Sequence, residues 1–169
     1  MIGQAVSLVL GNSFIPLFAI AVVMTIVKLR RFKLEHRPVN AAYVFWGEVL
    51  FYNVGIGFVL VGIFHAYFPQ IAAPSIGWTP SPFEYELGWI EIALGLVAIM
   101  ALWRGYEFRL AATIVFAIFA LAAAAGHIQQ IQCCHNYAPG NAGLTLWFGD
   151  IFVPVVIVVA AALCRGERS

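Results

Sequence analysis

Five long apolar segments constrain the fold of this chain more than any other feature of its sequence. They cover residues 5–29, 43–68, 84–103, 110–130 and 143–163. A bilayer core about 30 Å thick is crossed by roughly 20 helical residues, a length that these segments reach. Membrane β-strands alternate polar and apolar residues, and residues 111–126 do not alternate. The sequence therefore predicts an all-α, polytopic membrane helix bundle with five transmembrane helices, and residues 1–169 form a single transmembrane domain.

The composition supports lipid rather than water as the main solvent. Hydrophobic residues make up 63% of the chain and charged residues only 10%, whereas soluble domains average about 45–50% and about 25%. A water-soluble fold of this size has too little interior to bury the excess. The net charge of +1 gives no reason to expect a nucleic-acid partner. We expect a multi-pass protein of a bacterial or archaeal plasma membrane, surrounded by membrane lipids.

The positions of the basic residues predict the orientation. All nine Lys and Arg fall between the first and second segments, between the third and fourth, or after the fifth. The loops at residues 67–86 and 132–142 carry none. Because basic loops stay in the cytoplasm, we expect the N-terminus outside and the C-terminus inside. No basic residue precedes the first segment, so we interpret it as a membrane helix rather than a cleavable signal peptide.

Three ionisable residues lie inside the apolar segments at a similar depth near the outer side. They are Glu91 in the third segment, His127 in the fourth and Asp150 in the fifth. Each costs at least about 2.5–3.5 kcal/mol to insert into a membrane, which makes it a candidate functional residue. We interpret the three as pocket or proton-transfer residues. The alternative is that they only pair with one another and hold the helices together.

Four further residues near the same side are candidate ligand-binding residues: His65, Glu84, Gln130 and Trp147. Glu84 also ends the sequence Ser81-Pro82-Phe83-Glu84, which has the spacing of a capping box and predicts the start of the third helix. Pro154 follows Asp150 by four residues and removes a helical hydrogen bond, so we expect the fifth helix to bend there.

Metal and thiol chemistry are less well supported by the sequence. Glu, Asp and His suit several divalent ions, but no Glu-x-x-His or His-x-x-x-His pair occurs, and we assign no metal ligand. Cys133 and Cys134 are adjacent in the expected outer loop without a Cys-x-x-Cys motif, so a redox role for this pair remains one alternative.

The order of several short motifs resembles the DoxX/DoxD-like group of small membrane proteins. A Gly-rich helix with Asn53-Val54-Gly55-Ile56-Gly57 leads to a Pro-containing loop and a helix with Gly88-Trp89-Ile90-Glu91. The turn Trp103-Arg104-Gly105, an Ala-rich helix ending in Gly126-His127 and a final helix follow. The resemblance covers residues 48–163. It implies a four-helix core with one added N-terminal helix, and for some members partnership in a membrane-bound thiosulfate:quinone oxidoreductase.

Three functions follow from these observations. The first is a pocket on the outer-leaflet side that binds a lipophilic small molecule, with a quinone as the candidate cofactor and a redox-linked role as one option; whether it is an enzyme stays open. The second is a non-catalytic accessory subunit of a larger membrane complex, with membrane-protein partners or further copies of itself. The third is a proton-coupled or metal-ion carrier.

Overall fold

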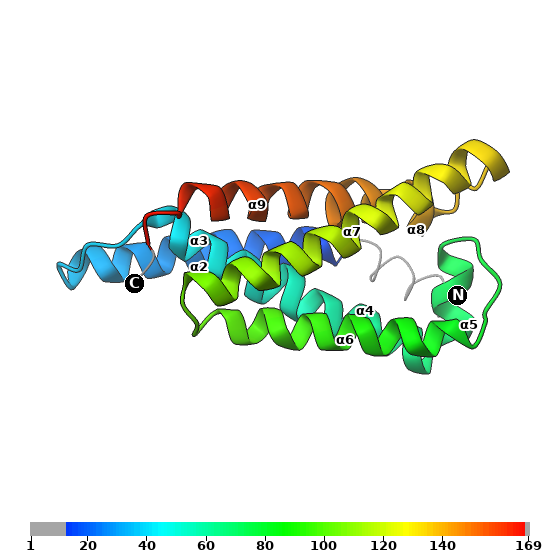
Figure 1. Ribbon diagram of the computed structural model, residues 1–169, viewed down its shortest axis with the longest axis horizontal. Coiled ribbons are helices and arrows are strands. Elements are labelled where there is room, and N and C mark those ends of the chain that lie inside the picture. Colours follow the sequence, from blue (N-terminus) through cyan, green and yellow to red (C-terminus); the bar gives the residue numbers. More distant parts are fainter. Residues whose placement is uncertain (1–12, 168–169) are drawn as a thin grey trace.

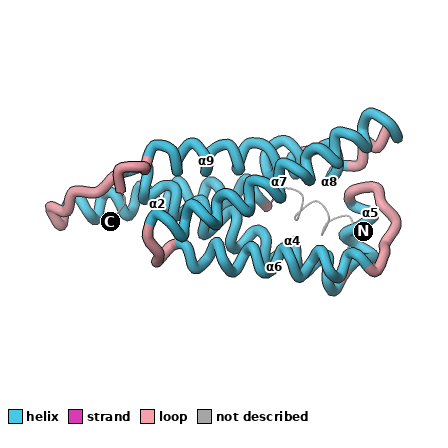
Figure 2. Tube along the Cα trace, in the orientation of Figure 1, coloured by secondary structure: helices cyan, strands magenta, loops and turns pink. Residues whose placement is uncertain are grey.

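The computed structural model describes residues 13–167, and this part of the chain is helical without a strand. Its elements are α2 (Phe14–Leu34), α3 (Ala41–Val49), η1 (Leu50–Ile56), α4 (Gly57–Tyr67), α5 (Pro69–Ser75), α6 (Phe83–Ala101), α7 (Tyr106–Cys134), α8 (Pro139–Ala142), η2 (Thr145–Phe152) and α9 (Val153–Leu163). The long helices run along one axis and form an elongated bundle (Figures 1 and 2).

Successive long helices are antiparallel, so the connections gather at two ends of the bundle (Figure 1). The basic end holds residues 35–40, the turn at residues 102–105 and the C-terminal end of α9. The opposite end, here called the loop-rich end, holds α5, α8 and residues 76–82 and 135–138. The helices expected at 43–68 and 84–103 match the continuous helix Ala41–Tyr67 and α6.

The membrane character of the fold rests on three helices that are long and apolar enough to cross a bilayer: Ala41–Tyr67, Tyr106–Cys134 and Pro139–Leu163. Large apolar side chains such as Ile118 and Val159 are exposed on them, which suits contact with lipid rather than water. The chain is therefore a helical membrane protein. The helices α2 and α6 carry more charged residues than these three, so the five spans stay a prediction. The orientation with the N-terminus outside also stays a prediction.

Glycines let the helix Ala41–Tyr67 approach α6 closely. A Cβ atom added at Gly88 would lie 2.5 Å from the Gly62 carbonyl oxygen, and one added at Gly95 would lie 2.7 Å from that of Gly55. Close backbone contact of this kind drives helix packing where the surrounding solvent is apolar. The same packing turns the buried face of α6, which carries Glu84 and Glu91, toward the bundle interior.

Two buried interactions anchor the basic end. The Nζ atom of Lys28 lies 2.5 Å from Oε1 of Glu48, which is 2% exposed. The buried guanidinium of Arg109 donates to the carbonyl oxygens of Tyr43, Ala101 and Leu102 at 2.8–3.0 Å. Ala101 and Leu102 end α6, so Arg109 satisfies carbonyls that lack a helical partner.

Several predicted boundaries differ from the structure. The first helix was expected to end at residue 29, but α2 continues to Leu34, because no Gly or Pro interrupts the basic run; residues 5–12 lie outside the described part. The loop expected at 67–86 contains α5, which begins with Pro69 at its first turn. The fourth helix was expected at 110–130 but spans Tyr106–Cys134, so Cys133 and Cys134 end a helix rather than occupy a loop.

The fifth helix contains a wide π-helical turn where a bend was expected. Helix η2 ends at Phe152, and Pro154 follows at the start of α9, which continues the same helix. A second π-helix, η1, interrupts the helix Ala41–Tyr67. Segments of π-helix are rare overall, but those that occur are often at functional sites. Helix η2 carries the buried Asp150.

Candidate functional site

A cavity of about 420 Å³ lies in the half of the bundle nearer the loop-rich end. Its lining is mostly apolar, and four ionisable side chains reach it: His65, Glu91, His127 and Asp150. They come from α4, α6, α7 and η2, so four helical elements supply one polar residue each. The structure thus brings the three central candidates of the sequence to a single cavity.

Aromatic rings close the cavity toward the basic end. Phe58 contacts the rings of Phe14, Phe116 and Phe119 at centroid distances of 6.3, 4.9 and 5.7 Å. The Phe14 ring packs against the backbone of Gly57 and Gly149, which have no side chains to hold it away. An apolar space with a few convergent polar groups is the usual form of a ligand pocket in a helix bundle.

His127 is oriented by Asn141, a residue with no exposed surface. The Asn141 Nδ2 group donates to the carbonyl oxygens of Asn136 and His127 at 2.9 and 3.3 Å, which leaves its Oδ1 atom 2.7 Å from His127 Nδ1. Because Oδ1 only accepts, Nδ1 carries a proton and donates. In the neutral ring Nε2 is then a free acceptor.

Nε2 of His127 faces the carboxylate of Asp150. The distance from Nε2 to Oδ2 is 3.7 Å, which is too long for a direct hydrogen bond. Both residues are at most 9% exposed. Trp78 lies over the same histidine, with ring centroids 6.2 Å apart. The two groups therefore lie within ion-pair range, and they form an ion pair when the imidazole is protonated and the carboxylate is ionised.

Two carboxylate oxygens at this cavity have no hydrogen-bond partner among the described residues. They are Oε2 of Glu91 and Oδ2 of Asp150, and both atoms are fully buried. A buried polar atom without a partner loses the energy of its bonds to water, at a cost of about 1–3 kcal/mol. Native structures contain few such atoms, and each calls for an explanation such as a functional role or an ordered water or ion.

Glu84 interacts with His65 rather than with the helix end. Its Oε2 atom lies 2.6 Å from His65 Nδ1, and the side chain of Glu84 is 5% exposed. The capping box expected at Ser81-Pro82-Phe83-Glu84 does not form, since Pro82 is the cap residue and no side chain caps the helix. His65 lines the cavity, whereas Glu84 contacts His65 and is not part of the lining.

Besides Glu84, two of the sequence candidates are absent from the lining of the cavity. Trp147 is 58% exposed and points outward from η2, because the wide π turn brings Leu146 and Asp150 to its buried face instead. Gln130 lies almost one helical turn beyond His127 and is not part of the lining. Neither fits the role of a ligand-binding residue in this cavity.

Sequence analysis missed Asn141 and Trp78, both of which contact His127. Asn141 ends Pro139-Gly140-Asn141, a sequence typical of a turn. Its polar type beside a predicted membrane helix was the one available signal, but its partner, 14 residues earlier, is set by the folded loop.

The two adjacent cysteines are free thiols at the end of α7. Their Sγ atoms lie 2.7 Å apart, and both residues are exposed. Among residues 13–167, no three His, Cys, Asp or Glu side chains gather in a way that would hold a metal ion.

The fold and the cavity define a class, an integral membrane helix bundle with a buried polar pocket. The chain belongs to DUF6790, a family of unknown function whose sequence profile matches residues 11–169. No curated protein and no solved structure matches the chain.

Proposed function

We propose that the cavity binds a lipophilic small molecule with a polar head, and that a quinone is its ligand. The observation that carries this proposal is the pair of unpartnered carboxylate oxygens, Oε2 of Glu91 and Oδ2 of Asp150, in an otherwise apolar space of about 420 Å³. The apolar walls suit a ring with hydrocarbon substituents, and the polar groups suit its oxygen atoms.

The chain's own residues divide the work in this proposal. His127, held by Asn141, accepts or donates a proton at Nε2, and Asp150 stabilises the charged ring. Glu91 binds the other side of the polar head from α6. When bound, a quinone would supply two-electron redox chemistry. His65 and Glu84 form a second hydrogen-bonded pair, of which His65 reaches the cavity wall.

The resemblance to DoxX/DoxD-like proteins is part of the same proposal. It supports a quinone because some members of that group take part in quinone reduction. The N-out orientation would open the cavity toward the outer leaflet. A carrier has less support, since Glu48 is bonded to Lys28 and aromatic rings separate it from the cavity. The accessory-subunit alternative predicts that the isolated protein holds no ligand.

The test is binding of decylubiquinone to the protein purified in mild detergent, together with mass spectrometry of its organic extract. We expect saturable binding, a co-purifying quinone in the extract, and a loss of about tenfold or more in affinity for His127→Ala, which removes a central hydrogen-bonding group. The matched control is His135→Ala, which changes an exposed histidine outside the cavity. Equal binding by both variants, or no binding by the wild type, would refute the proposal.

A further inference from the structure

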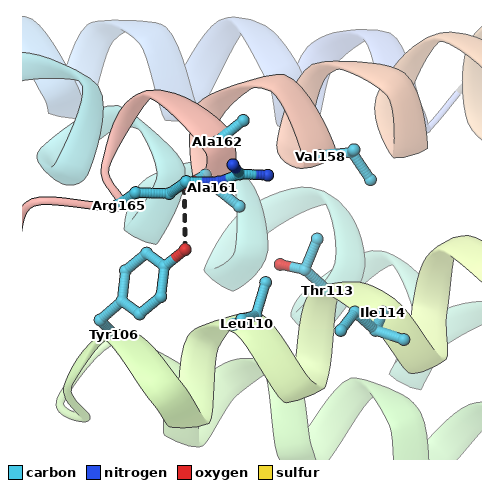
Figure 3. Close-up of a pocket in the computed structure, with 8 residues that line it drawn as sticks. All are labelled: Tyr106, Leu110, Thr113, Ile114, Val158, Ala161, Ala162 and Arg165. Atoms are coloured by element: carbon cyan, nitrogen blue, oxygen red, sulfur yellow. Dashed lines mark hydrogen bonds between the residues drawn. The ribbon is translucent and has the colours of Figure 1, made fainter. Parts of the chain in front are cut away.

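A second hollow lies far from the cavity, between α7 and α9 near the basic end. This groove has a volume of about 280 Å³ and is lined by Tyr106, Leu110, Thr113, Ile114, Val158, Ala161, Ala162 and Arg165 (Figure 3). Most of the lining is aliphatic. Small residues of α9 leave room beside the larger side chains of α7, so the groove is open to the molecule's surroundings.

The polar groups of the lining other than Arg165 already have partners. The hydroxyl of Tyr106 donates to the carbonyl oxygen of Ala161 at 3.3 Å (Figure 3). The hydroxyl of Thr113 accepts a hydrogen bond from the indole of Trp46 at 2.9 Å. These bonds hold α7 against its neighbours and leave an apolar floor.

Arg165 is the exposed cation of the groove. Its side chain lies along α9 next to Ala161 and Ala162 instead of extending away from the helix (Figure 3). The ion pairs formed within residues 13–167 involve Lys28, Arg31, Arg37, His65 and His127, and none includes Arg165. An unpaired guanidinium beside an apolar groove suits a molecule that has an anionic head and a hydrocarbon chain.

We propose that this groove binds an anionic phospholipid, with one acyl chain along Leu110, Ile114 and Val158 and the phosphate group at Arg165. Charge complementarity supports a lipid of this type, because the basic residues within residues 13–167 gather at this end of the bundle. Basic groups near helix ends attract anionic lipids at the membrane surface. The site is separate from the proposed ligand cavity and does not depend on it.

The experiment is native mass spectrometry of the purified protein with phosphatidylglycerol or phosphatidylcholine of identical acyl chains. We expect phosphatidylglycerol to be retained about fivefold better, as one extra cation at a membrane surface implies. Arg165→Gln should bring the ratio close to one, and Arg165→Lys should preserve most of it. The control Arg104→Gln removes an exposed cation outside the groove and should leave the ratio unchanged.

A second pair of variants tests the acyl chain. Ala162→Trp fills the groove and should lower retention of both lipids, whereas Val159→Trp changes an exposed residue of α9 outside the groove and should not. Equal retention of the two lipids by the wild type, or an unchanged ratio in Arg165→Gln, would overturn the proposal. Displacement of the lipid by millimolar inorganic phosphate would also overturn it, because the site would then recognise phosphate alone.

Discussion

Asn141 decides which nitrogen of His127 can act on a bound molecule. Its amide is fixed by two carbonyl acceptors, so the proton of the neutral imidazole stays on Nδ1 and Nε2 faces Asp150. The hydrogen bond at one nitrogen of a histidine sets whether the other nitrogen is available as an acid or a base. A buried asparagine in the short helix α8 thereby gains a positioning role that its sequence context does not indicate.

Replacing Asn141 with alanine should release this constraint. We expect ¹⁵N NMR of the histidine-labelled wild type at alkaline pH to show His127 protonated on Nδ1, and the Asn141→Ala protein to show a mixture of both tautomers. The free energy of unfolding should fall by about 1–3 kcal/mol, because the Nδ1–H group loses its buried acceptor. Gln129→Ala, an exposed change on the same helix, is the control. An unchanged tautomer in Asn141→Ala would contradict the assignment.

Glu91 should show a conflict between stability and binding. Its Oε2 atom is buried without a partner, so Glu91→Leu removes an unfavourable group and should raise the free energy of unfolding by about 1 kcal/mol or more. The same variant should lose decylubiquinone binding, a trade-off common at functional sites. Glu86→Leu lies on the exposed side of α6 and should change neither measurement by much. A destabilised Glu91→Leu protein would favour a structural role in holding helices together.

At the scale of elements, apolar length predicted most of the helices. Gly55 and Gly62 are seven residues apart and share a helix face, but that this face packs against α6 is known only from the fold. The wide turn at η2 could not be predicted in this way. Pro154 indicates a disturbance, but whether the chain bends or widens depends on the neighbours that bury Leu146 and Asp150.

The glycine contact between α4 and α6 should be intolerant of a single methyl group. In Gly88→Ala the new Cβ would lie 2.5 Å from both the Gly62 carbonyl oxygen and the Ala66 nitrogen, so the helices must separate. We expect a loss of about 1–3 kcal/mol in the free energy of unfolding. Gly126→Ala is the matched control, because nothing lies within 4 Å of its added Cβ. It should be neutral or stabilising by up to about 1 kcal/mol. Similar losses in both variants would contradict the close-contact interpretation.

At the scale of the whole molecule, the sequence predicted a helical membrane protein with polar groups gathered at one end. That gathering indicates where the polar groups of the cavity lie, but not which other residues surround them. The loop-rich end brings Asn141 and Trp78 to His127, and ring packing places Phe58 at the cavity. Neither effect produces a periodic pattern in the sequence. Membrane orientation is a property of the chain in its bilayer, and the coherent placement of cations at the basic end is the physical argument for it.

Labelling of introduced cysteines tests this orientation. Cys164 is unsuitable as a reporter, because its thiol is fully buried and burial raises its pKa, so it should react with a maleimide only after denaturation. The better reporters are Leu34→Cys at the basic end and Tyr137→Cys at the loop-rich end, which replace side chains that are 81% and 67% exposed. Both belong in a background in which Cys133, Cys134 and Cys164 are replaced.

In intact cells, a membrane-impermeant maleimide should label Tyr137→Cys and leave Leu34→Cys unmodified. Permeabilised cells should give labelling of both, which shows that each thiol is reactive once reached. The physical reason is the one-sided distribution of Lys and Arg, which retains the basic end in the cytoplasm during insertion. The reverse pattern would invert the bundle and direct the cavity toward the inner leaflet. Labelling of both positions in intact cells would place the two ends of the bundle on the same side of the membrane. That result would contradict the three membrane crossings predicted between residues 34 and 137.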